Sequence, residues 1–117
     1  MSTIKILLIP ADLDQPITWQ DIDSGLAAFQ AIVGGQVQVV PLHVPGTDLW
    51  CNEYTPVTGL PLAVNPRATR LYHRAGGMPW ANVFGDTFIT GGADDEGETL
   101  GLSHAQAELL NLDGASS

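Results

Sequence analysis

Residues Asn65 to Leu102 read NPRATRLYHRAGGMPWANVFGDTFITGGADDEGETLGL, and the rest of the chain is organised around them. It opens with Asn65-Pro66, which is a helix-start signal. Asparagine is a favoured N-cap because its side-chain oxygen accepts a hydrogen bond from an amide of the first turn. Proline suits the first helical position, where its missing N–H is not needed. Gly76-Gly77 favours a helix end, since glycine takes the left-handed C-terminal conformation without strain. The sequence therefore predicts a helix from Pro66 to about Ala75.

The three arginines of the chain fall on one face of that helix, because positions i, i+3 and i+7 share a stripe at about 100° per residue. An adjacent apolar stripe is expected to pack on the body of the protein, and it consists of Ala68, Leu71, Tyr72 and Ala75. The chain has only four basic residues and a net charge of −9, so the arginine face concentrates positive charge on an acidic protein.

Arginine recognises phosphate and carboxylate through a planar fork of donors. The arginine face therefore predicts a site for an anion. Trp80, which follows Pro79, is expected to line a pocket beside it. The candidate ligand-binding residues are Arg67, Arg70, Arg74, Asn65, His73 and Trp80.

The acidic residues of the same stretch give the arginines an alternative role. Asp86 lies in a strand expected over Asn82–Thr90, and the remaining acids occupy a loop bounded by glycines: Asp94, Asp95, Glu96 and Glu98. Arginines on exposed helices commonly form ordinary surface ion pairs with such residues. Anion recognition and internal ion pairing both fit the sequence.

The acidic loop also resembles a metal site in composition. When Gly97 is aligned with the invariant glycine of the EF-hand calcium loop, the first and last ligand positions fall on Gly92 and Ser103. Both positions should be acidic, so the template fails. We expect a solvated, flexible loop and no metal or cofactor, with a weak Mg²⁺ or Ca²⁺ site as the minor alternative.

Several motifs of this stretch resemble a known family. NPRAT (Asn65–Thr69) is followed by Gly85-Asp86 before an apolar strand, and then by TGGADDEGETLGL (Thr90–Leu102). In this order they are similar to the domain of unknown function 3846 family, and the resemblance covers about Phe29 to Leu102. It implies a bacteriophage or actinobacterial origin. It implies no established activity, and so no catalytic residues can be carried over.

Composition limits the class of protein. The 117 residues suffice for one domain, expected over residues 1–112, with a flexible tail at 113–117. The single Cys51 allows no internal disulfide, and the chain shows no signal peptide or long apolar run. We therefore expect a soluble, cytoplasmic protein. The negative charge argues against direct binding to nucleic acid or to an acidic membrane.

The remaining elements are expected from apolar patterns. Strands or extended segments are predicted at Ile4–Ile9, Gln36–Leu42, Asp48–Tyr54 and Leu60–Val64. Helical periodicity extends over Thr18–Val33 and stops at Gly34-Gly35; the cap is either Thr18 or, for a shorter helix from Ser24, Asp23. Ser103 and Gln106 have capping-box spacing, which predicts a last helix through Leu112.

These elements predict an α+β fold, with a small mixed or mainly antiparallel sheet and two or three helices over one face. An exposed sheet edge would allow a homodimer.

Enzyme motifs are missing from the sequence. It contains no phosphate loop with lysine, no Gly-x-Ser-x-Gly elbow and no zinc-ligand spacing among its histidines. The leading hypothesis is a non-catalytic, phage-type accessory protein that binds a host protein or a small anionic ligand through the arginine face. The second is an acidic decoy that mimics nucleic acid toward a host DNA-binding protein. The third is a small metal-dependent hydrolase that uses Asp86 and the carboxylates of Asp94–Glu98.

Overall fold

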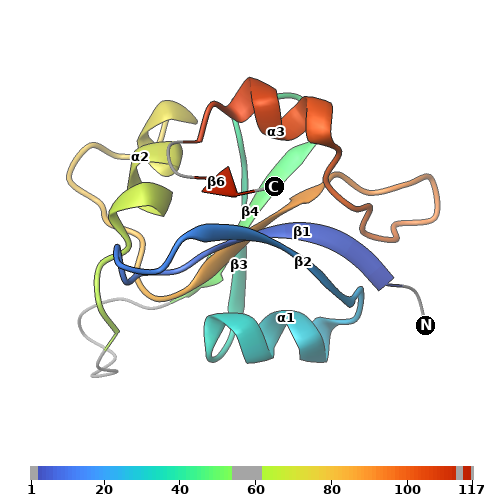
Figure 1. Ribbon diagram of the computed structural model, residues 1–117, viewed down its shortest axis with the longest axis horizontal. Coiled ribbons are helices and arrows are strands. Elements are labelled where there is room, and N and C mark those ends of the chain that lie inside the picture. The colour runs from blue at the N-terminus through green and yellow to red at the C-terminus, as the bar shows by residue number, and fades with distance from the viewer. Residues whose placement is uncertain (1–2, 54–61, 113–114, 117) are drawn as a thin grey trace.

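The computed structural model describes residues 3–53, 62–112 and 115–116. These residues form one sheet and three helices (Figure 1). The strands are β1 (Thr3–Ile9), β2 (Ile17–Asp23), β3 (Val37–Pro41), β4 (Thr47–Asn52), β5 (Thr87–Gly91) and β6 (Ala115–Ser116). The helices are α1 (Leu26–Val33), α2 (Pro66–Arg74) and α3 (His104–Leu110). The predicted α+β class is confirmed.

β1 lies inside the sheet although it comes first in the chain. The strand order is β3-β4-β5-β1-β2-β6, and neighbours run antiparallel except for β6, which pairs in parallel with β2. β1 forms a hairpin with β2 and pairs on its other side with β5, where Leu7 lies opposite Ile89. β5 therefore joins the β1–β2 hairpin to the β3–β4 hairpin, and the sheet is mainly antiparallel, as predicted.

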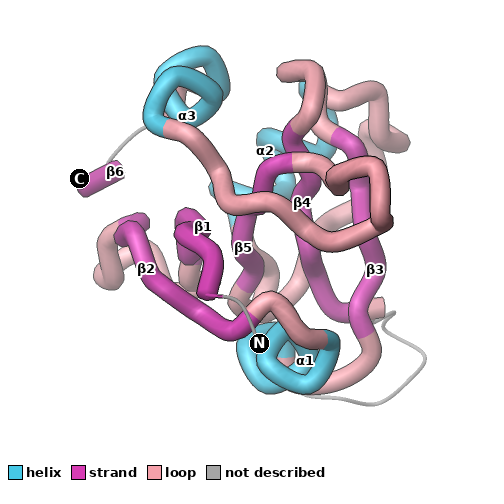
Figure 2. Tube along the Cα trace, turned by 90° about the vertical axis from the view of Figure 1, so that its right-hand side faces the viewer, coloured by secondary structure: helices cyan, strands magenta, loops and turns pink. Residues whose placement is uncertain are grey.

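The helices cover both faces of this sheet. α1 lies on one face, and α2 and α3 lie on the other (Figure 1). Figure 2 shows α3 above the β1–β2 side and α1 on the opposite side. Successive residues of β1 point to opposite faces, so Ile6 packs in a cluster with Phe29 of α1, whereas Leu7 belongs to the cluster with Leu71 of α2. The expectation of helices over one face is wrong, because the run Ile4–Ile9 is apolar on both sides and needs cover on both.

The helix predicted over Thr18–Val33 is wrong in its first half. Residues Ile17–Asp23 form β2 and pair with β1. The helix starts only at Leu26, after Gly25, which has an extended backbone and gives no side-chain cap. The shorter alternative from Ser24 lies nearer to the observed start. The apolar spacing suited a helix locally, but pairing with a buried strand overrides such a local pattern.

β5 is shorter than the strand expected over Asn82–Thr90. Phe84 forms an isolated bridge with Val64, and Gly85 then takes a positive φ of 78°. The regular strand begins at Thr87. Gly85 therefore separates the bridge from the strand, in the left-handed conformation that glycine tolerates best.

Other local predictions agree with the structure. Asn65 caps α2 by accepting a hydrogen bond from the amide of Ala68 at 3.0 Å. Ser103 and Gln106 form the expected capping box of α3, which ends at Leu110 rather than at Leu112. Residues Tyr54, Leu60 and Pro61 of the expected extended segments, and residues 113, 114 and 117 of the expected tail, lie outside the described residues. Where the chain is described, its helices are too short or too polar to span a lipid bilayer.

Candidate functional site

The arginine side of α2 faces a small pocket. Arg67, Arg70 and Arg74 line it together, as the helical spacing predicts. Its volume is about 220 Å³. Residues from β2, from α2 and from the end of α3 complete its wall, namely Ile17, Leu71, Asn111 and Leu112. We call this the arginine pocket, and it gathers three of the four basic residues of the chain.

Arg67 is held by the turn between β1 and β2. The two N–H groups of its Nη2 are shared among three backbone carbonyls, those of Pro10 at 2.8 Å, Asp12 at 3.1 Å and Gln15 at 2.8 Å. Its Nε is buried and has no hydrogen-bond partner among the described residues. A guanidinium group has five N–H donors. These contacts therefore fix the group in place while one of its donors stays unsatisfied.

Arg74 is held by the end of α3. Its Nη1 donates a hydrogen bond to the carbonyl of Leu110 at 3.1 Å, and carbonyls at a helix C-terminus have no partner within the helix. The positive charge of Arg74 also acts beyond the pocket. The pKa of His43 is lowered first by its burial and second by the charge of Arg74. His43 therefore lies close enough to Arg74 to feel its charge.

The ion pairs with acidic residues that the sequence allowed are not formed by two of these arginines. Neither Arg67 nor Arg74 forms an ion pair with a carboxylate in the described part of the chain. One ion pair joins Lys5 and Asp21 at 4.0 Å, on the exposed surface of the β1–β2 hairpin. Backbone carbonyls hold Arg67 and Arg74 instead, and a carbonyl carries no net charge to neutralise them.

The acidic residues lie elsewhere. Asp86 precedes β5 and accepts a hydrogen bond from the amide of Ala11 at 3.0 Å, whereas the acidic loop follows the other end of β5. In that loop, one oxygen of Asp94 accepts from the amides of Glu96 and Glu98, each at 2.9 Å. All four acids of the loop are exposed: Asp94, Asp95, Glu96 and Glu98. Among the described residues, no three acidic, histidine or cysteine side chains gather as metal ligands would.

Asn65 and His73 hold the neighbouring segment in place. Asn65 is fully buried, and its Nδ2 donates to the carbonyls of Ile9 at 2.8 Å and of Gly85 at 2.9 Å. The Nε2 of His73 lies 2.8 Å from the carbonyl oxygen of Ala81. This contact fits the tautomer that carries its proton on Nε2. Both side chains therefore stabilise the positions of the chain segments next to α2.

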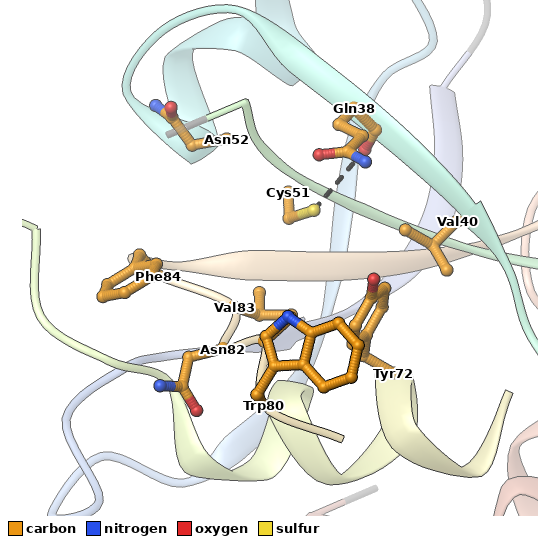
Figure 3. Close-up of a pocket in the computed structure, with 10 residues that line it drawn as sticks. Gln38, Val40, Cys51, Asn52, Tyr72, Trp80, Asn82, Val83 and Phe84 are labelled. Carbon is orange, nitrogen blue, oxygen red and sulfur yellow. Dashed lines mark hydrogen bonds between the residues drawn. The ribbon is translucent and has the colours of Figure 1, made fainter. Parts of the chain in front are cut away.

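A larger pocket of about 370 Å³ lies on the other flank of α2 (Figure 3). Figure 3 shows the rings of Tyr72 and Trp80 next to each other, below the side chains that β3 and β4 contribute. The lining residues with amide, thiol or polar aromatic side chains are Gln38, Cys51, Asn52, Tyr72, Trp80 and Asn82. We call it the aromatic pocket. The sequence grouped Trp80 with the arginine face, but Trp80 lines this second pocket and is not among the residues that line the arginine pocket. No local pattern in the sequence shows that β3 and β4 lie across from α2.

Cys51 at the wall of this pocket is held as a neutral thiol. It is buried, and its Sγ donates a weak hydrogen bond to the carbonyl of Gln38 at 3.7 Å. Burial raises the pKa of the Cys51 thiol from 9.0 to about 11. The thiolate is the nucleophilic form of cysteine. The position of Cys51 in the pocket wall therefore fits a packing role, as its sequence context indicated.

We expect Cys51 to react slowly with iodoacetamide in the folded protein. At pH 8 the raised pKa lowers the thiolate fraction about 100-fold relative to the unfolded chain. Labelling followed by mass spectrometry in buffer and in urea measures this ratio, and Cys51→Ser gives the background. Because the folded pKa is the higher one, the contribution of the thiol to stability is complete below pH 9 and is lost as the pH rises to about 11. Equal labelling rates in the folded and unfolded protein would contradict the assignment.

The chain belongs to the family described as Domain of unknown function (DUF3846), whose model matches residues 4–112. The resemblance noted in the motifs of Asn65–Leu102 is thereby confirmed, and the match reaches from β1 to the residues after α3. No curated protein and no solved structure is significantly similar to the chain. The description of the family states no activity, so a function has to be argued from the two pockets themselves.

Proposed function

We propose that the protein is a non-catalytic binding module that takes a small anionic ligand in the arginine pocket. One observation carries this proposal. Three of the four basic residues line a single pocket, and two of them, Arg67 and Arg74, are fixed by carbonyls rather than neutralised by described carboxylates. A protein of net charge −9 that keeps its few cations in this way supports recognition of an anion.

The hydrogen bonds of Arg67 hold its guanidinium group in place before a ligand binds. A side chain that is already held loses little conformational freedom when it binds, which favours affinity. The buried Nε of Arg67 lacks a partner among the described residues, and an unsatisfied buried donor is unfavourable. Burial also strengthens a charge-assisted hydrogen bond relative to the same bond in water.

The residues that line the arginine pocket and its volume limit the kind of anion that it can bind. Ile17, Leu71 and Leu112 contribute apolar surface, and the volume of about 220 Å³ is below the range of about 300–1,000 Å³ typical of sites for larger ligands. A compact phosphate monoester or carboxylate with a small apolar group fits these features. The described lining residues include no carboxylate, histidine, cysteine or serine to act as base or nucleophile. Binding without chemical conversion is therefore the proposed activity.

Neutralising Arg70 is the first test. Phenyl phosphate and inorganic phosphate are titrated into the full chain by calorimetry, and we expect binding of phenyl phosphate that Arg70→Gln weakens at least about tenfold, since a charge-assisted contact contributes about 1.5–3 kcal/mol. The matched control is Lys5→Gln, which removes the same charge from β1 and leaves the arginine pocket intact. Melting temperatures of both variants check the fold.

Two results would overturn the proposal. One is the absence of binding for phosphate, phenyl phosphate and benzoate at low ionic strength. The other is an equal loss of affinity in Lys5→Gln and Arg70→Gln, which would make the effect one of net charge and not of the arginine pocket.

A further inference from the structure

The aromatic pocket differs from the arginine pocket in every feature that selects a ligand. Tyr72, Trp80 and Phe84 give it three aromatic rings, and three amide side chains complete its polar surface: Gln38, Asn52 and Asn82. No charged side chain is among the described residues that line it. Its chemistry is therefore aromatic and amide, without a counter-charge for an ion.

The ring of Tyr72 and the chain segment that carries Trp80 are held against α2. A Cβ atom on Gly77 would lie 2.3 Å from the ring of Tyr72, so the ring packs directly on a residue that must lack a side chain. The segment with Trp80 is tied to α2 by His73, as described above, and by Thr69, whose Oγ1 accepts from the amide of Val83 at 2.9 Å. These contacts place the Tyr72 ring against Gly77 and fix the backbone on the C-terminal side of Trp80.

Trp80 remains available at this pocket. Its side chain is 78% exposed, the largest exposure among the large hydrophobic residues of the described chain. Figure 3 shows its ring beside that of Tyr72, on the same side of the pocket. A planar ring system is the partner that stacks best on an exposed indole, because both faces are flat and apolar.

The amides supply a polar edge for such a ring. The Nδ2 of Asn52 donates to the carbonyl of Val33 at 3.0 Å, so this amide is fixed. The residues Gln38 and Asn82 are exposed, and each amide offers a donor and an acceptor next to each other. This pair of groups matches the edge of a nucleobase, as in the two-bond contact of asparagine or glutamine with adenine.

We propose that the aromatic pocket binds a neutral, nucleobase-type heterocycle, which stacks on Trp80 and Tyr72 and bonds to the amides of Gln38 and Asn82. The lack of lining cations and the net charge of −9 select the free base or nucleoside over nucleic acid. This site is independent of the arginine pocket, because the two lie on different flanks of α2 and share no described lining residue.

The test is a calorimetric titration of adenosine, guanosine, cytidine and uridine into the full chain. We expect adenosine to bind, Trp80→Ala to weaken it at least tenfold, and Trp80→Phe to retain most of the affinity because a ring remains. Asn82→Asp should weaken adenosine binding by removing a donor. Leu109→Ala is the matched control, since it removes an exposed apolar side chain from α3 without touching the pocket. Arg70→Gln should leave adenosine binding unchanged, so a failure of the anion site and a failure of this site can be told apart.

Three outcomes would refute the assignment. The first is that none of the four nucleosides binds at millimolar concentration. The second is that adenosine binds equally to Trp80→Ala. The third is that glucose, titrated in parallel, binds in a Trp80-dependent manner and adenosine does not, which would make the pocket a carbohydrate site.

Discussion

Replacing Asn65 with alanine is expected to lower the free energy of unfolding by about 3 kcal/mol. The side chain is fully buried and makes three hydrogen bonds, to the amide of Ala68 and to the carbonyls of Ile9 and Gly85. Loss of the helix cap contributes about 1 kcal/mol, and loss of each buried hydrogen bond contributes a similar amount. Urea unfolding followed by circular dichroism measures the change.

The control for this variant is Ser103→Ala. Ser103 caps α3 through the same kind of contact, but it lies on the surface. We expect a loss of about 1 kcal/mol there. If both variants lost the same stability, the bonds of Asn65 to β1 and to the segment before β5 would contribute nothing. Asn65 would then be an ordinary cap.

Gly91→Ala is expected to destabilise the protein by about 3 kcal/mol or more, and poor expression would be consistent with that loss. Gly91 ends β5, and its amide donates to the carbonyl of Leu100 at 3.0 Å. A Cβ atom on Gly91 would lie 2.4 Å from the carbonyl oxygen of Gly101. That oxygen belongs to the backbone and cannot turn aside as a flexible side chain would, so the two segments have to separate. Chemical denaturation of the purified variant gives the magnitude.

Gly25→Ala is the matched substitution. No atom lies within 4 Å of a Cβ placed on Gly25, and its φ of −86° suits any residue. We expect a change below about 1 kcal/mol. A comparable loss at both positions would show that glycine content matters in general, and that the close approach at Gly91 does not.

Local signals in the sequence predicted local structure. Asn65-Pro66 and Ser103 marked the starts of α2 and α3, because a cap depends on residues three positions apart. The arginines were expected on one stripe, and they line one pocket. In each case the residues that interact are close in the chain, so their spacing carries the information.

Contacts between distant segments were beyond the reach of sequence spacing. Arg67 donates a hydrogen bond to the carbonyl of Pro10, 57 positions away in the chain. Every residue has a backbone carbonyl, so the sequence does not show which one accepts this bond. The same holds for the aromatic pocket, where Gln38 and Trp80 come from separate elements. The helix assignment failed over the first half of Thr18–Val33 for this reason, since the competing partner, β1, lies outside that segment.

The position of β5 between β4 and β1 affects how the chain matures during synthesis. The ribosome releases β1 and β2 before β5, so β1 acquires its second neighbour only after residues Thr87–Gly91 have emerged. Until then one edge of β1 has unpaired N–H and C=O groups, and Leu7 and Ile9 lack their cover from α2 and α3. Assembly of the sheet has to wait for this long-range pairing, which is slow in proteins rich in non-local contacts. The β1–β2 hairpin is therefore open to a chaperone or a protease until β5 has emerged.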